Sequence, residues 1–481
     1  MEPAVISNIE FNFDPAATPI WPVRSADLAA WQAAHPGPMS AWCDSNDFTA
    51  VAGKFIRLPG DDGTLAGVLL GMGEGGDKAA DYWAFGSLAN ALPPGLYRIE
   101  GDLSSAAQSD LADHAALAWA QAAYRFTRYH SNDDAPSGDG SDDSDKVARL
   151  CLPENTAAAA LQGAIKGSFL ARDLINTPAS DMGPEELADA AVALADEFGA
   201  KANVIVGDDL LAENYPAIHA VGRASTRAPR LIDLRWGEGD APRLTLVGKG
   251  VCFDTGGLDL KSAAGMLKMK KDMGGAATVL GLAAMIMAAK LPVALRVLIP
   301  AVENSVAGNA FRPGDVLATR KGLTVEVGNT DAEGRIVLCD ALAEADSDDP
   351  ALIIDVATLT GAARVALGQD VPAIFTGSDD LAADLMRLGE TLDDPSWRLP
   401  LYAPYKERLN SKVADLNNVS DGPMAGAITA ALFMQAFVSQ PDRWLHMDSY
   451  GWNDRDRPGR PAGGDGLAMR ALFALVKERF A

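Results

Sequence analysis

The stretch Asn329-Thr330-Asp331-Ala332-Glu333-Gly334-Arg335 carries two carboxylates and a guanidinium at alternate positions. On an extended backbone these three side chains would point to the same side, and Gly334 would allow a tight bend after the carboxylates. A strand-like run at residues 323–327 precedes the stretch, and residues 336–342 follow it with helical spacing. The carboxylates are therefore predicted at a strand-to-helix turn, where open α/β sheets bind their ligands.

A second group of acidic and basic residues lies upstream and is predicted to meet the first. Residues 243–247 read as a short buried strand, and Lys249 and Asp254 follow it on a glycine-rich loop that continues towards Asp272. Converging carboxylates must be neutralised by cations, and oxygen-rich clusters suit divalent ions such as Mg, Mn or Zn. The size of the set favours two metal ions over one. The set consists of four carboxylates, those of Asp254, Asp272, Asp331 and Glu333, and the amine of Lys249.

Other kinds of catalytic site find less support in the sequence. Lys249 could instead bind a phosphate from its glycine-rich loop, but the surrounding residues match neither GxxxxGK[ST] nor GxGxxG. The histidines form no HExxH pair, which argues against a His-ligated zinc protease. His446 is expected to be a core residue. A GxSxG elbow is absent, which argues against a serine hydrolase.

Composition limits the class of protein and its partners. The chain of 481 residues is 48% hydrophobic and 22% charged, as in an ordinary soluble globular protein. Its net charge of −24 opposes binding to nucleic acid or to an anionic membrane. Four scattered cysteines without a CxxC pair indicate reduced thiols and a cytoplasmic location. The N-terminus lacks a signal-peptide pattern. The apolar run at residues 276–289 is too short to span a membrane.

The order of predicted elements indicates an α/β protein of two domains. Residues 1–155 are rich in tryptophan and are predicted to form a small N-terminal α/β domain that contains an exposed loop at 131–145. Residues 156–176 are predicted to form a linker helix, and residues 177–481 are predicted to form a catalytic domain. Alternating strands and helices predict a mostly parallel mixed sheet flanked by helices on both faces. Strand-like runs lie at 202–206, 230–234, 244–247, 295–300, 324–327, 351–356, 373–375 and 444–448, and helical patterns at 184–198, 274–289, 332–346 and 425–438.

The two acidic segments resemble the leucyl aminopeptidase (cytosol aminopeptidase) family. Its signature is Asn-Thr-Asp-Ala-Glu-Gly-Arg-Leu, and here Ile336 replaces the final Leu, a volume-conserving change. The upstream pattern Gly-Lys-Gly…Phe-Asp-Thr-Gly-Gly…Lys…Asp-Met matches as well, as do residues 172–178, 308–315 and 414–418. The resemblance covers residues 160–480, whereas the N-terminal region departs from the pattern of the family.

This resemblance implies a metal-dependent aminopeptidase that hydrolyses the N-terminal residue, preferably Leu or a similar apolar residue, from short peptides. Two metal ions, Mn or Zn with Mg or Co also compatible, would hold a bridging hydroxide and polarise the scissile carbonyl. By this resemblance one ion would be held by Asp254, Asp331 and Glu333, together with the backbone carbonyl of Asp331. The other would be held by Asp254, Asp272, Glu333 and a neutral Lys249.

The resemblance also assigns roles to residues outside the metal ligands. Lys261 would stabilise the developing oxyanion, although by spacing alone it could be a solvated surface lysine. Arg335 would hold a bicarbonate ion that carries the proton, although it could instead pair with an aspartate. Met269, Thr358 and Gly361 would line the pocket for the substrate side chain. A homohexamer is implied, with enclosed sites that restrict substrates to short peptides.

Two rival functions remain open from the sequence. A di-metal phosphoesterase would need further phosphate-facing cations beyond Lys261 and Arg335. A nucleic-acid-binding regulator acting through the N-terminal domain is opposed by the net charge. The sequence does not rank the metals or the preferred N-terminal residues.

Overall fold

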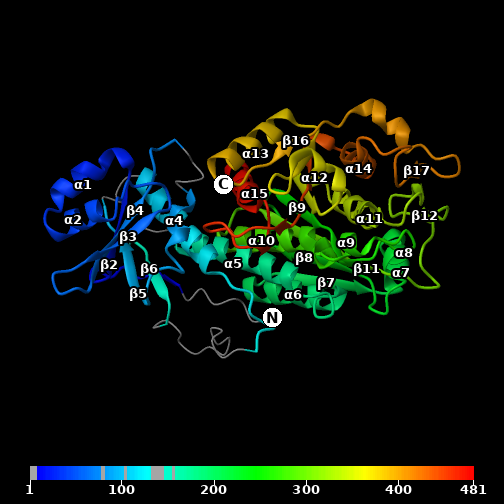
Figure 1. Ribbon diagram of the computed structural model, residues 1–481. Coiled ribbons are helices and arrows are strands. Elements are labelled where there is room, and N and C mark those ends of the chain that lie inside the picture. Colours follow the sequence, from blue (N-terminus) through cyan, green and yellow to red (C-terminus); the bar gives the residue numbers. More distant parts are fainter. Residues whose placement is uncertain (1–7, 77–81, 102–105, 132–145, 154–157) are drawn as a thin grey trace. The chain divides into compact units, whose positions relative to one another are not determined.

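The computed structural model describes residues 8–76, 82–101, 106–131, 146–153 and 158–481 (Figure 1). All but Ser131 of the loop predicted at 131–145 lies outside these ranges. The chain forms two compact units, of which one comprises residues 170–453 and 463–481 and the other residues 2–169 and 454–462.

The larger unit is built on a nine-stranded sheet in the order β16-β15-β18-β14-β9-β11-β8-β7, with β10 pairing with β11. Strands β9 and β10 run parallel to consecutive halves of β11, so the chain between them, at Lys249, lies inside the sheet. Most pairs are parallel, while β8 and β15 are antiparallel to their inner neighbours. This confirms the predicted mostly parallel mixed sheet. The strands are β7 Lys201–Val206, β8 Arg230–Trp236, β9 Arg243–Gly248, β10 Gly250–Asp254, β11 Ala294–Asn304, β14 Leu352–Ala357, β15 Ala373–Thr376, β16 Trp397–Arg398 and β18 Trp444–Asp448.

Helices cover both faces of this sheet (Figure 1). On one face α10 packs on β9 and β14, with α6 and α15 beside it; on the other face α11 packs with α8 and α14. A Cβ added at Gly275 would lie 2.1 Å from the Val356 carbonyl oxygen, so glycine lets α10 approach β14 closely. The helices are α6 Pro184–Phe198, α7 Asp209–Ala212, α8 Pro216–Gly222, α9 Ala263–Met266, η4 Met269–Met273, α10 Gly274–Ala288, α11 Glu333–Ser347, α12 Gly361–Leu367, α13 Asp379–Thr391, η5 Ala403–Leu409, α14 Gly426–Gln435, η6 Pro441–Arg443 and α15 Met469–Phe480.

Helix α10 is apolar on all sides because it lies in the core. Together with η4 it forms a helical segment, Met269–Ala288, whose 20 residues and mean hydropathy of 1.2 would suffice to cross a membrane. This is longer than the apolar run predicted at 276–289. However, 94% of its apolar window is buried inside the protein, which is typical of the central helix of a globular domain.

The strand before the acidic stretch belongs to a different sheet from the one expected. β13 has only three residues and pairs with β12 and β17 in a separate three-stranded sheet. The carboxylates at 331 and 333 therefore do not follow a strand of the main sheet. The strands of the two small sheets are β12 Val316–Ala318, β13 Thr324–Glu326, β17 Leu416–Asn417, β19 Trp452–Asn453 and β20 Gly463–Gly464.

The smaller unit contains a six-stranded sheet in the order β1-β6-β5-β2-β4-β3, parallel except for the β3–β4 pair. Trp31 packs in a core cluster with Val23, Cys43, Leu58 and Leu69. The unit is therefore α/β, as predicted. Its elements are β1 Ile9–Glu10, β2 Thr18–Val23, η1 Ser25–Asp27, α1 Leu28–Ala34, α2 Pro38–Ser45, β3 Phe55–Pro59, β4 Leu65–Gly71, η2 Ala84–Ser87, β5 Gly95–Ile99, α4 Ala106–Ala123, β6 Ala148–Cys151 and α5 Ala158–Asn176, whose last turns belong to the larger unit.

Candidate metal and peptidase site

A buried lysine lies among carboxylates that come from distant parts of the chain. Lys249 lies between β9 and β10, Asp272 on η4, and Glu333 is the first residue of α11. The Lys249 Nζ is 2.8 Å from Asp272 Oδ2 and 2.9 Å from Glu333 Oε1, and it donates a hydrogen bond to the Thr358 carbonyl at 2.9 Å. The side chains of Lys249, Asp272 and Glu333 are at most 5% exposed. The fold thus gathers these charges away from water.

The local backbone differs from the expected one. Asp331 lies in a turn and Glu333 begins a helix, so the chain through the two carboxylates is not extended. Asp254 is the last residue of strand β10 and does not lie on a loop. Gly334 lies within α11, where it provides room: a Cβ there would be 2.6 Å from Lys249 Cε and 2.7 Å from its Nζ. Glycine at 334 therefore leaves the space that the end of the lysine side chain occupies beside Glu333.

Asp254, Asp272 and Glu333 form a cluster suited to a divalent cation. One carboxylate oxygen from each lies within 4.8 Å of the others. Glu333 Oε2 has no hydrogen-bond partner among the described residues, and the contacts of Lys249 with Asp272 Oδ2 and Glu333 Oε1 are ion pairs outside hydrogen-bonding geometry. Buried carboxylate oxygens without donors are what a hard metal ion would satisfy. These residues fit such an ion.

The pKa values of this cluster follow from its burial and crowding. Burial raises the pKa of Glu333, and the nearby Asp254 raises it further, while Lys249 opposes the shift. For Lys249 burial disfavours the ammonium, but the coulombic effect of Asp272 and Glu333 outweighs burial and raises its pKa above the ordinary value. The acids and the lysine therefore depend on one another for charge compensation.

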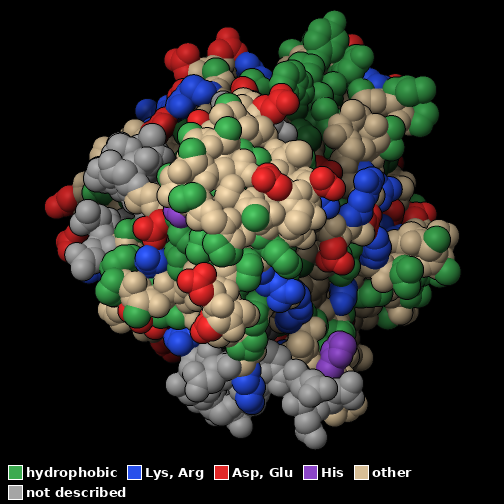
Figure 2. All heavy atoms as spheres, turned by 60° about the vertical axis from the view of Figure 1, so that its left-hand side comes forward, with side chains coloured by type: hydrophobic (Ala, Val, Ile, Leu, Met, Phe, Trp, Pro, Cys, Tyr) green, Lys and Arg blue, Asp and Glu red, His purple; other side chains and the backbone are tan. Residues whose placement is uncertain are grey.

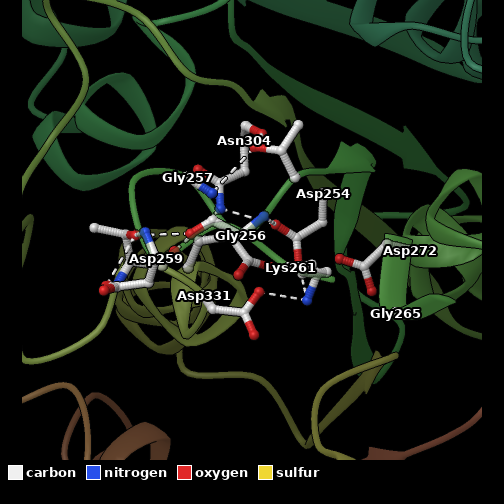
Figure 3. Close-up of polar contacts among 12 residues, drawn as sticks. Asp254, Gly256, Gly257, Asp259, Lys261, Gly265, Asp272, Asn304 and Asp331 are labelled. Carbon is white, nitrogen blue, oxygen red and sulfur yellow. Dashed lines mark hydrogen bonds and ion pairs between the residues drawn. The ribbon is translucent and has the colours of Figure 1, made fainter. Parts of the chain in front are cut away.

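A second lysine bridges the more open side of the site (Figure 3). Lys261 Nζ is 2.8 Å from Asp254 Oδ2 and also pairs with Asp331 Oδ1. The side chain of Lys261 is 16% exposed and that of Asp331 is 35% exposed, so this side faces solvent. Burial alone would lower the pKa of Lys261, but the two carboxylates raise it, which keeps the ammonium charged. Lys261 is thus held within the acidic cluster.

The loop after β10 is shaped to hold Asp254 (Figure 3). The Asn304 side chain and the Gly256 backbone N–H both donate to Asp254 Oδ1 at 2.8 Å. Gly256 and Gly257 have φ of +88° and +65°, a left-handed conformation that favours glycine. The Thr330 hydroxyl donates to the Gly256 carbonyl oxygen and so joins this loop to the one that carries Asp331.

Arg335 lies on α11, and its side chain makes one hydrogen bond to the described residues. Its Nη1 donates to the Asn418 carbonyl oxygen at 2.8 Å, and its Nε has no partner among the described residues. Burial lowers the pKa of Arg335 to about 10, although Asp448 and Glu333 act against this shift. Within the part of the chain that the structure describes, no carboxylate pairs with Arg335.

The three predicted pocket residues differ in whether they contact the acidic cluster. Thr358 donates to Asp272 Oδ1 at 2.8 Å and so touches the cluster directly. Gly361 begins α12, and a Cβ there would meet nothing within 4 Å. Met269 begins η4 and is partly exposed. The structure thus brings Thr358 to the site and leaves open space at Gly361.

Several residues that support the site could not be assigned a role from the sequence. The Asn418 side chain accepts from the Gly328 N–H and donates to the Asn329 carbonyl oxygen, both at 2.7 Å, and so holds the loop before Asp331. In the sequence, Asn418 was indicated only by its place in the stretch 414–418, which matches the family pattern. Asp448 accepts from the N–H groups of Leu359 and Thr360 and from the Thr360 hydroxyl, which fixes the loop that follows Thr358.

Two sequence models of protein families match the chain. The sequence model "Cytosol aminopeptidase family, catalytic domain" matches residues 169–473, and "M17 aminopeptidase, N-terminal domain" matches residues 18–137. The second match corrects the expectation that the N-terminal region departs from the family. A probable cytosol aminopeptidase of Stenotrophomonas maltophilia is 38% identical over 452 residues, which is 90% of each chain.

Solved structures of similar proteins cover nearly the whole chain. The cytosol aminopeptidase from Coxiella burnetii is 46% identical, with a TM-score of 0.90 over 98% of this chain and 99% of that one. The bottromycin maturation enzyme BotP in complex with Mn is 32% identical, with a TM-score of 0.85 over 97% of this chain and 100% of that one. Sequence and structure together establish that this chain belongs to the cytosol aminopeptidase family and is an aminopeptidase, a metal-dependent hydrolase.

Proposed function

We propose that this enzyme removes the N-terminal residue, preferably Leu or a similar apolar residue, from short peptides with the help of two divalent metal ions. The observation that carries this proposal is the buried cluster of Asp254, Asp272 and Glu333, whose oxygens converge without sufficient hydrogen-bond donors. Lys261 and Asp331 extend the cluster towards solvent, where a peptide can enter.

We propose that these three acids, together with Asp331 and Lys249, serve two metal positions. Asp254, Asp331 and Glu333 would hold one ion, and Lys249, Asp254, Asp272 and Glu333 the other. Without a metal ion the carboxylates raise the pKa of Lys249, but a bound cation would repel the ammonium and take over its charge compensation, so Lys249 could coordinate as a neutral amine. Such ions supply Lewis acidity that activates water and polarises a carbonyl. Carboxylates with one amine tolerate Mn, Zn, Mg or Co, and we propose Mn or Zn. The solved complex of BotP with Mn supports the choice of Mn.

The chain's own residues then position the peptide and its charges. Lys261, whose pKa is raised by Asp254 and Asp331, remains an ammonium that can donate to the oxygen of the scissile carbonyl as negative charge develops there. Arg335 has an unpartnered Nε and would hold a bicarbonate ion, a proton carrier between water and the leaving amine. Met269, Thr358 and Gly361 would accept an apolar side chain.

We also propose a cytoplasmic homohexamer. All four cysteines are buried and unpaired, which suits a reducing compartment. Large apolar side chains are exposed around the site-bearing loops, among them Leu260 at 61%, Leu267 at 80% and Val365 at 85%. Exposed apolar surface of this kind is typical of subunit interfaces. Light scattering after size exclusion would give six chains, and a monomer would contradict the proposal.

Chelation followed by metal addition tests the catalytic proposal. After EDTA treatment and dialysis, hydrolysis of Leu-p-nitroanilide should be lost, and Mn²⁺ should restore it. Asp272→Asn should fail to recover and should bind less Mn²⁺ by calorimetry, while Asp421→Asn, an exposed acid paired with Arg408, should behave as wild type. Full activity after chelation would contradict the proposal. Cleavage of p-nitrophenyl phosphate in place of the anilide would favour the phosphoesterase alternative.

A further inference from the structure

Two cations converge on one aromatic ring beside the predicted substrate pocket. Lys271 Nζ lies 4.7 Å from the centre of the Tyr450 ring, and Arg364 Cζ lies 5.3 Å from it. Lys271 is only 6% exposed, yet among the described residues its ammonium makes no hydrogen bond and no ion pair, while its backbone N–H donates to the Lys268 carbonyl oxygen. Arg364 is exposed and also lacks a carboxylate partner there.

An unpaired buried ammonium is unusual in this unit. Other largely buried cations lie within 3.3 Å of a carboxylate oxygen; they are Arg172, Lys249, Lys261, Arg296 and Arg470. Arg335 also has no carboxylate partner among the described residues, and bicarbonate is its proposed ligand. Burying a charge without a counter-charge is costly, and the contact of Lys271 with Tyr450 offsets only part of that cost. The environment of Lys271 therefore favours an anionic ligand.

The position of this cluster relates it to the substrate. Arg364 lies three residues after Gly361 on α12, so these two residues lie on the same face of that helix. Lys271 lies two residues after Met269 on η4 and so does not share its face; Tyr450 relates Lys271 to the pocket instead. Tyr450 precedes Gly451, where an added Cβ would be 2.9 Å from Thr358 Cγ2 and 3.8 Å from the Lys271 carbonyl oxygen. Each member of the cluster thus adjoins a predicted pocket residue.

The two nearby acids already have other partners. Burial lowers the pKa of Lys271, and Asp272 and then Asp448 oppose this shift. Asp272 pairs with Lys249 and accepts from the Thr358 hydroxyl, and the Asp448 oxygens accept hydrogen bonds from Leu359 and Thr360. Lys268 and Lys270 approach a different ring, that of Trp452, at 5.8 Å and 5.7 Å. The cations at the Tyr450 ring are therefore distinct from the other lysines of this segment.

We propose that Lys271, Arg364 and Tyr450 bind the side-chain carboxylate of substrates whose N-terminal residue is acidic, with Glu favoured over Asp. The proposal rests on the proposed aminopeptidase function and adds an acidic class to its apolar substrates. The two methylenes of Glu would pack against the adaptable thioether of Met269, and its carboxylate would provide the counter-charge for Lys271. Asp, one methylene shorter, would reach the cations less well.

The test compares substrates that differ only in charge. The Mn-loaded full-length enzyme is assayed with Glu-, Gln-, Asp- and Leu-p-nitroanilide, and the kcat/KM ratio of Glu to Gln is determined for each variant. Wild type should favour Glu. Lys271→Met and Arg364→Gln should each lower the Glu/Gln ratio by about tenfold. Lys271→Arg should largely restore it, and Lys268→Met, the same charge change beside the Trp452 ring, should leave the ratio as it is.

Several outcomes would overturn the proposal. One is a wild-type enzyme that cleaves Leu-p-nitroanilide but does not favour Glu over Gln. Another is an equal fall of the Glu/Gln ratio in Lys268→Met, which would show that the overall positive charge of residues 268–271, and not the Tyr450 cluster, sets the ratio. A third is a Lys271→Met variant that loses discrimination between Leu-Gly and Leu-Gly-amide while keeping the Glu/Gln ratio, which would assign the cations to the peptide C-terminus. Absence of Leu-p-nitroanilide hydrolysis with metal present would instead refute the proposed function. Because Arg364 is exposed, Arg364→Gln keeps the test valid even if Lys271→Met does not fold.

Discussion

Two buried charge clusters in the larger unit have opposite character. Around Arg296 the guanidinium donates to Asp233 at 3.0 Å and 2.7 Å, to Glu344 at 2.6 Å and to Asp348 at 2.5 Å. Burial opposes ionisation of Glu344, but Arg296 and Arg320 outweigh it and lower the pKa of that carboxyl. Around Lys249 the pKa of Glu333 is instead raised, by burial first and then by Asp254. The pKa values of two buried glutamates on the same helix, α11, are thus shifted in opposite directions.

We interpret this difference in pKa shift as the difference between charges that stabilise the fold and charges of the proposed metal site. A guanidinium supplies five fixed donors, enough to compensate the acids around it. A lysine ammonium compensates its acids less completely, and Glu333 Oε2 keeps no donor among the described residues. Perturbed, under-satisfied carboxylates cluster at functional sites. The comparison predicts that changes in the Arg296 cluster affect stability and changes in the Lys249 cluster affect activity.

The largest expected effect is on folding. Arg296→Met leaves three carboxylates without their shared partner and should lower the free energy of unfolding by about 3–5 kcal/mol, as for other broken buried pairs. Urea denaturation measures it. Arg387→Met, which removes an exposed pair with Glu478, should change stability little. Equal effects of the two substitutions would contradict the comparison.

At Lys261 the effect should instead be on turnover. Lys261→Met should lower kcat for Leu-p-nitroanilide about 10²–10³-fold at saturating Mn²⁺, because a donor to the developing oxyanion is removed. The melting temperature should remain close to that of wild type, and Lys412→Met, an exposed lysine, serves as control. Wild-type kcat in Lys261→Met would show that Lys261 has no catalytic role.

The contribution of Asp340 to stability should depend on pH. Burial raises the pKa of Asp340 to about 6, although the N–H groups of Arg320, Ala217 and Ile218 oppose the shift. Since the folded pKa exceeds the unfolded one, the folded state holds the proton more tightly, and this contribution to stability is lost as pH rises through 6. The free energy of unfolding of the wild type, relative to that of Asp340→Asn, should therefore fall by up to about 3 kcal/mol between pH 4 and pH 7, as measured by urea denaturation. A stability difference independent of pH would contradict this.

The smallest effect concerns space beside Lys249. Gly334→Ala places a methyl group 2.6 Å from Lys249 Cε and should cost about 1–3 kcal/mol through overpacking. It should also weaken Mn²⁺ binding. At Gly308 an added Cβ meets nothing within 4 Å, so Gly308→Ala is the matched control and should be nearly neutral. Unchanged Mn²⁺ binding in Gly334→Ala would show that the lysine can move aside.

The main sheet and its helices could largely be predicted from local pattern. Helix α6 coincides with the predicted 184–198 because Pro184 lies at its first turn and Gly199 ends it in a left-handed conformation. The apolar run of α10 and the buried strand β18 were equally plain. These elements are encoded by neighbouring residues, so periodicity and capping identify them.

What depended on tertiary contacts could not be predicted in the same way. β13 has strand-like residues, but only its pairing with β17 shows that it lies outside the main sheet. The role of Gly334 depends on Lys249, which is far away in the sequence. Asn304, Asn418 and Asp448 are ordinary polar residues until the fold places them against the site. The predicted ligands themselves came from a motif, and their convergence is a property of the folded chain.

The central claim is that the carboxylates around Lys249 and Lys261 form a di-metal site. A crystal of the chelated enzyme soaked in MnCl₂ and measured at the Mn absorption edge tests it directly. We expect two anomalous peaks, both bounded by Asp254 and Glu333, one adjoining Asp272 and the other Asp331. A map without anomalous density at these residues, with the lysines still paired to the carboxylates, would contradict the account.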